Sequence, residues 1–228
     1  MPRLCFPSFA LTLAAVFLGA LVARGADEKT LTTIAMPPGG ISSSIAARIN
    51  SQGYRVAGGE GTVCEVWLSK DLPVKPKFKP SLNVKYPFAS GELVGVIRVA
   101  DKGEYNDFRG QPVKPGVYTL RYGQQPQDGN HIGTSELADF LVAIPAAADT
   151  DPKPIASLEE LHKASAKTVG GNHPAIFSLL PAESAAGAAT LTKDENDRWV
   201  LAAPAQTVQD GKKAPLSVRL VVVGKVAG

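Results

Sequence analysis

The chain has 228 residues, of which 44% are hydrophobic and 20% are charged, and its net charge is +3. This near-neutral composition is typical of a globular protein and gives no reason to expect nucleic acid as a partner. The sequence contains no Walker loop and no G-x-S-x-G, H-E-x-x-H or C-x-x-C motif, so the easily recognised nucleotide-binding, hydrolase, metalloprotease and redox classes are not indicated.

Residues 1–25 have the features of a secretory signal peptide. A short basic start precedes an apolar run over residues 4–22, and Ala23 and Gly25 are small residues at the −3 and −1 positions of a cleavage site. Cleavage would leave residues 26–228, periplasmic or secreted, with a net charge near +1 and no contact with the membrane. An uncleaved anchor is the alternative, because the apolar run is about long enough to span a bilayer.

The rest of the chain is a series of short β-type runs separated by Gly, Pro, Asn and Asp. These runs cover residues 62–69, 92–100, 116–123, 137–145, 175–181 and 216–224, and a polar turn at 193–197 indicates a further hairpin. Because helices between them are nearly absent, the pattern predicts one mainly β domain, an antiparallel β-sandwich with one short helix. The predicted core contains Val66, Leu68, Val94, Val96, Ile97, Tyr118, Leu120, Phe140, Val142, Ile176, Leu179, Trp199, Leu220 and Val222.

In the first of these runs, Thr62–Ser69, alternation separates two faces. Cys64 shares one face with Val66 and Leu68, and Glu65 shares the other with Val63 and Trp67. Cys5 leaves with the signal peptide, so Cys64 has no partner within its own chain for a disulfide. We expect a buried structural thiol; a nucleophile or an intermolecular bridge is the alternative.

Three other segments differ from the strand pattern. Residues 36–60 are ambiguous between a short helix and irregular strands. Residues 70–87 combine five lysines with four prolines, which predicts an extended edge or loop; a contact surface for an anionic polymer or a partner is the alternative. A connector and helix are expected at about 146–168, because Ser157 and Glu160 form a capping box ahead of an apolar stripe.

The polar stretch Arg121–Phe140, which begins at the end of the 116–123 run, is the first candidate site. Besides its turn residues it contains Arg121, Tyr122, Asp128, Asn130 and His131, which have the hydrogen-bonding groups of a sugar or peptide site. The alternative is an ordinary structural loop in which these side chains satisfy backbone groups.

Two of the three histidines, His131 and His173, occur in similar Gly- and Asn-containing settings. If their loops meet, the two imidazoles and a carboxylate, Asp128 or Asp139, would suit a divalent metal or acid–base chemistry. The spacing is too irregular to form a metal signature, so no cofactor is expected and a divalent metal is the alternative.

The stretch Val113–Tyr122 contains P-G-x-Y-x-L, with Tyr118 and Leu120 alternating on one face. It resembles a strand opening of transthyretin-like and carboxypeptidase-regulatory-like sandwich domains, which implies an immunoglobulin-like or transthyretin-like fold and no activity. The signal peptide, the strand with Trp67 and the loop before His131 are also similar to uncharacterised secreted bacterial proteins.

Three functions fit these features. The favoured one is a non-catalytic binding or accessory module of the cell envelope, with a glycan or a protein as partner. The second is a metal- or histidine-dependent hydrolase that uses His131 and His173. The third is a structural envelope component without a small ligand.

Overall fold

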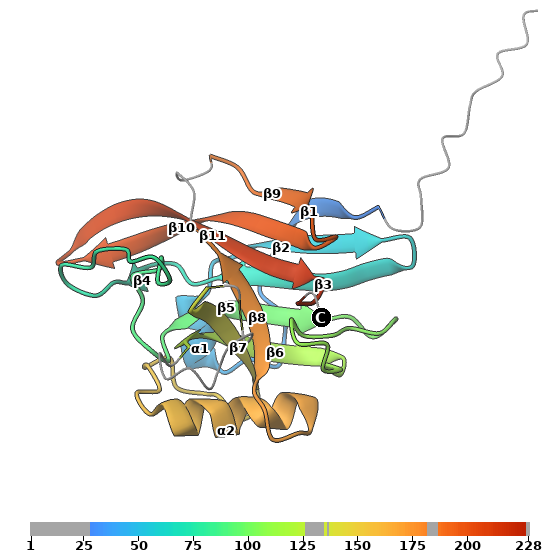
Figure 1. Cartoon of the computed structure of the whole chain (residues 1–228), viewed down its shortest axis with the longest axis horizontal. Coiled ribbons are helices and arrows are strands. Elements are labelled where there is room, and N and C mark those ends of the chain that lie inside the picture. The colour runs from blue at the N-terminus through green and yellow to red at the C-terminus, as the bar shows by residue number, and fades with distance from the viewer. Residues whose placement is uncertain (1–27, 126–134, 136, 182–186, 227–228) are drawn as a thin grey trace, which may run out of the picture.

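The computed structural model describes residues 28–125, 135, 137–181 and 187–226. The elements are β1 (Thr30–Ala35), α1 (Ser43–Arg48), β2 (Gln52–Gly58), β3 (Gly61–Leu68), β4 (Leu72–Pro73), β5 (Leu93–Val99), β6 (Gly116–Gln124), β7 (Asp139–Pro145), α2 (Leu158–Val169), β8 (Ala175–Leu180), β9 (Thr190–Lys193), β10 (Trp199–Gln209) and β11 (Lys212–Val223). The prediction of a mainly β chain is confirmed (Figure 1).

The strands of the described residues form one hydrogen-bonded path in the order β1-β2-β3-β5-β6-β7-β8-β11-β10-β4, with β9 also paired to β10. All neighbours are antiparallel except the short β4–β10 pair. The two separate sheets of a sandwich are not what the structure shows, because β8 joins β7 on one side and β11 on the other. The sheet thus curls back over itself and approaches a barrel.

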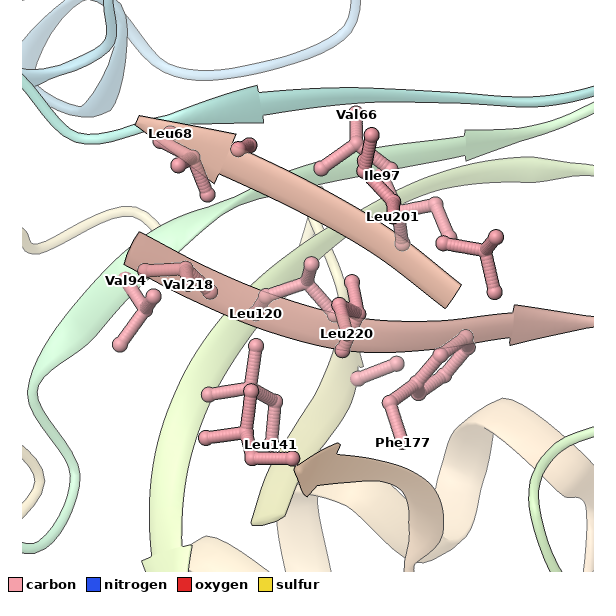
Figure 2. Close-up of a cluster of buried hydrophobic side chains, with 14 of the residues drawn as sticks. Val66, Leu68, Val94, Ile97, Leu120, Leu141, Phe177, Leu201, Val218 and Leu220 are labelled. Carbon is pink, nitrogen blue, oxygen red and sulfur yellow. The ribbon is translucent and has the colours of Figure 1, made fainter. Parts of the chain in front are cut away.

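The core lies where β10 and β11 cross the inner face of the curled sheet. Figure 2 shows Leu201 and Leu220 from this crossing pair close to Val66, Ile97 and Leu120 from the strands beneath. All fourteen residues of the predicted core are buried. Burial of such side chains stabilises a fold by roughly 1.5–3 kcal/mol each, and within the described residues Cys64 is a free, buried thiol.

The outer face of the sheet is covered in part by the two helices, which explains why the central strands are apolar on both faces. The predicted capped helix is α2: it begins after Ser157, whose hydroxyl accepts the N–H of Glu160 at 3.2 Å. It lies against β7 and β8, with Leu161 buried in a cluster on that side (Figure 1). The ambiguous segment contains α1, whose Ile45 packs on the outer face beside Trp67.

The Lys- and Pro-rich segment 70–87 is largely extended, as predicted, and its strand β4 pairs with the edge of β10. Its last part enters the core: Tyr86 is 0% exposed, as is Phe88 directly after the segment. The Tyr86 hydroxyl donates to the carbonyl of Leu180 at 3.0 Å and accepts the N–H of Arg219 at 2.9 Å. Hydrogen bonds from β4 near its start and from Tyr86 near its end therefore hold this segment against the sheet.

Candidate anion-binding site

Arg121, in the predicted ligand loop, lies inside the protein with an exposed fraction of 0%. Its Nε donates to Oδ2 of Asp149 at 2.6 Å and its Nη2 to Oδ1 at 2.7 Å. Its Nη1 donates to the carbonyls of Gly91 and Lys153, both at 2.8 Å. These bonds fix the connector before α2 to the sheet, and the ligand contact predicted for Arg121 stays a prediction.

Tyr122 and Asp139 are also buried and bonded to each other, since the tyrosine hydroxyl donates to Oδ1 of the carboxylate. Oδ2 of Asp139 accepts the backbone N–H groups of Lys85, at 2.5 Å, and Tyr86, at 3.4 Å. Burial raises the pKa of both Asp139 and Tyr122. The pair holds the end of segment 70–87 in place, and the ligand role of Tyr122 and the metal role of Asp139 stay predictions.

The structure describes one of the other predicted site residues. Asp128, Asn130 and His131 lie outside the described residues, and His173 is exposed in the turn after α2. Among the residues that the structure describes, no group of three or more His, Cys, Asp or Glu is placed to hold a metal ion. The metal hypothesis thus stays a prediction that depends on His131 and Asp128.

A different set of charged side chains does converge, on the outer face of the sheet. Arg55 on β2 lies directly opposite Glu65 on β3, which lies opposite Arg98 on β5. The Arg55 Nε donates to Oε1 of Glu65 at 2.7 Å, and the Arg98 Nε donates to Oε2 at 2.5 Å. These three residues occupy one row across three strands because residues opposite each other in a ladder share a face.

The central carboxylate is the buried member of this row. The Glu65 side chain is 4% exposed, against 43% for Arg55 and 37% for Arg98. Burial raises the pKa of Glu65, but the hydrogen bonds from Arg98 and Arg55 outweigh it and hold that pKa below its usual range. The bond to Glu65 in turn raises the pKa of Arg98. The row therefore carries three full charges, with one positive charge in excess.

The row forms one side of a pocket of about 390 Å³. We call it the arginine pocket; it is lined by Ile34, Ala35, Met36, Pro38, Gly39, Arg55, Glu65, Trp67 and Arg98. Trp67 lies flat against Gly53, where an added Cβ would come within 2.3 Å of the indole Nε1. Met36 is 73% exposed and has a positive φ of 66° at the point where the chain leaves β1.

The chemistry of the pocket is that of anion recognition. In the described part of the chain, the hydrogen bonds from Arg55 and Arg98 to Glu65 use Nε, which leaves the Nη groups of two half-exposed guanidinium groups for a ligand. A guanidinium presents its N–H groups as a planar fork that matches carboxylate, sulfate or phosphate. Because Glu65 already orients both arginines, less conformational entropy is lost when an anion binds.

A second and larger hollow, of about 810 Å³, lies beside the turn between β2 and β3 and the end of β11. Its lining includes apolar Val63 and Val223 together with Lys102 and Glu104. Charges of both signs surround it, so its lining selects no class of ligand as clearly as the arginine pocket does.

Sequence reasoning placed Glu65 and Trp67 correctly on the face opposite Cys64, but it did not find the arginine pocket. Arg55 and Arg98 lie 10 and 33 positions away from Glu65 in the chain. Only the strand order and register bring them to its two sides. One feature of the sequence does point to the pocket: Glu65 is an acid in the middle of an otherwise apolar strand. A buried carboxylate needs cationic partners, because burying an unpaired charge is costly.

Comparisons with models of protein families, with curated proteins and with solved structures find no match for the chain. Within the residues described, no helix is long and apolar enough to cross a membrane. The geometry of the arginine pocket is therefore the observation on which a function can be based.

Proposed function

We propose that the chain is an exported, non-catalytic binding or accessory protein of the cell envelope that recognises an anionic group on a glycan or protein ligand. The signal-peptide features of residues 1–25 support export. The row Arg55–Glu65–Arg98 supports the anionic specificity, and it is the single observation that carries the proposal.

The size and the charge of the arginine pocket agree with this function. Its volume of about 390 Å³ falls at the lower end of the range of small-molecule sites. One charge-assisted hydrogen bond contributes roughly 1.5–3 kcal/mol, so a carboxylate held by both arginines would be bound specifically but not tightly. A single sugar acid or one acidic side chain fits that description.

The test measures the affinity of purified residues 26–228 for glucuronate by calorimetry, with uncharged glucose as the comparison ligand. The variant Arg98→Gln removes one guanidinium, and we expect its affinity for glucuronate to fall by about ten- to a hundredfold, the equivalent of roughly 1.5–3 kcal/mol. Arg109→Gln is the matched control, because Arg109 is an exposed arginine outside the pocket.

Binding should also weaken as salt is added, because exposed charges are screened. Equal affinity for glucose and glucuronate, or equal losses in Arg98→Gln and Arg109→Gln, would contradict the proposal.

A further inference from the structure

Strand β1 forms one end of the hydrogen-bonded path and, among the described residues, pairs only with β2. Its sequence, Thr30–Ala35, is TLTTIA and contains no charge, no proline and no glycine. Free edges are usually protected by lysine, proline or a bulge, since an unprotected edge pairs with other chains. At the other end of the path, segment 70–87 has that protection and β1 does not.

The ladder register shows which backbone groups of β1 face outward. The N–H of Met36 donates to the carbonyl of Ser51, just beyond the start of β2, at 2.6 Å. In an antiparallel ladder every second residue bonds to the same neighbour. Counting back from Met36, the N–H and C=O groups of Thr33 and Ala35 therefore point away from β2.

The outward-facing groups of Thr33 and Ala35 lie in the far half of β1 and belong to exposed residues, whereas Thr30 and Leu31 at its beginning are partly buried. The ammonium of Lys29 lies 5.7 Å from the ring centroid of Trp199, and Trp199 is the ladder partner of Lys193 at the end of β9. This contact places the end of β9 beside Lys29, which precedes β1. The far half leads to the exposed Met36 and lines the arginine pocket.

We propose that the far half of β1 binds an extended polypeptide segment with acidic side chains, which adds to the sheet as a further strand. This inference rests on the proposed function and narrows its ligand to protein. Backbone hydrogen bonds to Thr33 and Ala35 supply affinity, as in other cases of strand addition, and side chains supply specificity. Exposed Met36 supplies an adaptable apolar contact at the end of the edge.

The register also explains why the segment is acidic. Arg55 lies opposite Thr32 in the ladder, so the two share the outer face of the sheet. A residue of the added strand opposite Thr32 would lie two strand spacings from Arg55, about 9.6 Å between Cα atoms. An arginine and a glutamate together span that distance over the short threonine. A second copy of the chain that paired through the same edge would place the uncharged side chains of its own β1 beside Arg55 and offer no acidic partner.

The probe is a synthetic peptide of alternating valine and glutamate, compared with a peptide of alternating valine and lysine and with free glucuronate. Two variants change the same residue. Thr33→Pro removes the outward N–H without breaking the β1–β2 ladder, because proline is tolerated on a free edge. Thr33→Val keeps the N–H and is the matched control.

We expect the valine–glutamate peptide to bind at least about tenfold less tightly to Thr33→Pro than to the wild type, an effect of one or two lost hydrogen bonds and a blocked edge. Glucuronate should bind both variants equally, and Thr33→Val should bind the peptide like the wild type. Hydrogen exchange on the wild-type protein is the second measurement: the peptide should protect the amides of Thr33 and Ala35.

Three results would overturn the inference. The first is a folded Thr33→Pro variant that binds the valine–glutamate peptide as tightly as the wild type does. The others are unchanged hydrogen exchange at the amides of Thr33 and Ala35 when the peptide is added, and equal affinity for the valine–lysine and valine–glutamate peptides. Protection of both amides without peptide, together with the mass of a dimer, would show that a second copy pairs with this edge and would also overturn it. In each case glucuronate binding that is sensitive to Arg98→Gln would leave the proposed function standing. Loss of that sensitivity would remove the proposed function itself.

Discussion

Replacement of Arg121 by methionine should destabilise the fold more than the loss of a half-exposed charge such as Arg55. Methionine keeps much of the side-chain length but removes the guanidinium. Among the described side chains, Asp149, 6% exposed, then keeps the hydroxyl of Thr119, at 2.5 Å, as its partner. The carbonyls of Gly91 and Lys153 lose their guanidinium donor as well. Removal of one partner of a buried ion pair typically costs about 3–5 kcal/mol, a large part of the roughly 5–15 kcal/mol that stabilises an ordinary domain.

Urea unfolding of Arg121→Met, followed by circular dichroism, measures this loss. Arg55→Met is the matched control: its side chain is 43% exposed, so its ion pair should contribute no more than about 1 kcal/mol. The double variant Arg121→Met, Asp149→Leu should recover part of the stability, because no unpaired charge stays buried. A cost below about 1 kcal/mol for Arg121→Met, or a double variant less stable than the single one, would show that the buried pair does not stabilise the fold in this way.

Three further predictions concern the row and the core. Glu65→Gln should destabilise the protein by about 1–3 kcal/mol at neutral pH. Because the pKa of Glu65 is lowered in the folded state, its contribution is present above the unfolded pKa of about 4.3 and is lost as pH falls through the folded value, so unfolding of wild type and variant should converge in acid. Gly53→Ala should cost about 1–3 kcal/mol in thermal unfolding and alter tryptophan fluorescence, because its Cβ would lie 2.3 Å from Nε1 of Trp67; an unchanged melting temperature would contradict this packing. Burial raises the pKa of Cys64 to about 12, so a thiol reagent at pH 8 should label it only after unfolding, and labelling of the native protein would show that the strand opens.

The strands could be predicted from the sequence because their alternation is a local property. Val66 and Leu68 occupy the inner face and Trp67 the outer face, as the two-residue period requires. The closure of the sheet could not be predicted in the same way. It depends on two ladder pairs between β8 and β11, among them Leu179 with Leu220, which are distant in the chain.

In the candidate site, too, local features of the sequence could be predicted, but contacts between distant residues could not. The polar side chains of Arg121 and Tyr122 are predicted from the sequence to contact a ligand, and the structure shows each bonded to a partner from elsewhere in the chain, Asp149 and Asp139. A buried polar residue and an exposed one look alike in a sequence until the partner is known. Arg55 beside Glu65 became visible only when register placed them in adjacent strands.

The proposed function requires that Arg55 and Arg98 hold an anion at the outer face of the sheet. Nuclear magnetic resonance of the arginine side chains, assigned with Arg55→Lys and Arg98→Lys, observes this binding at the two guanidinium groups themselves during a titration with glucuronate. We expect saturable shifts of the Nε–H and Nη–H signals of these two residues and none for Arg109. Saturable shifts confined to other arginines, or no saturation at all, would contradict the proposed function.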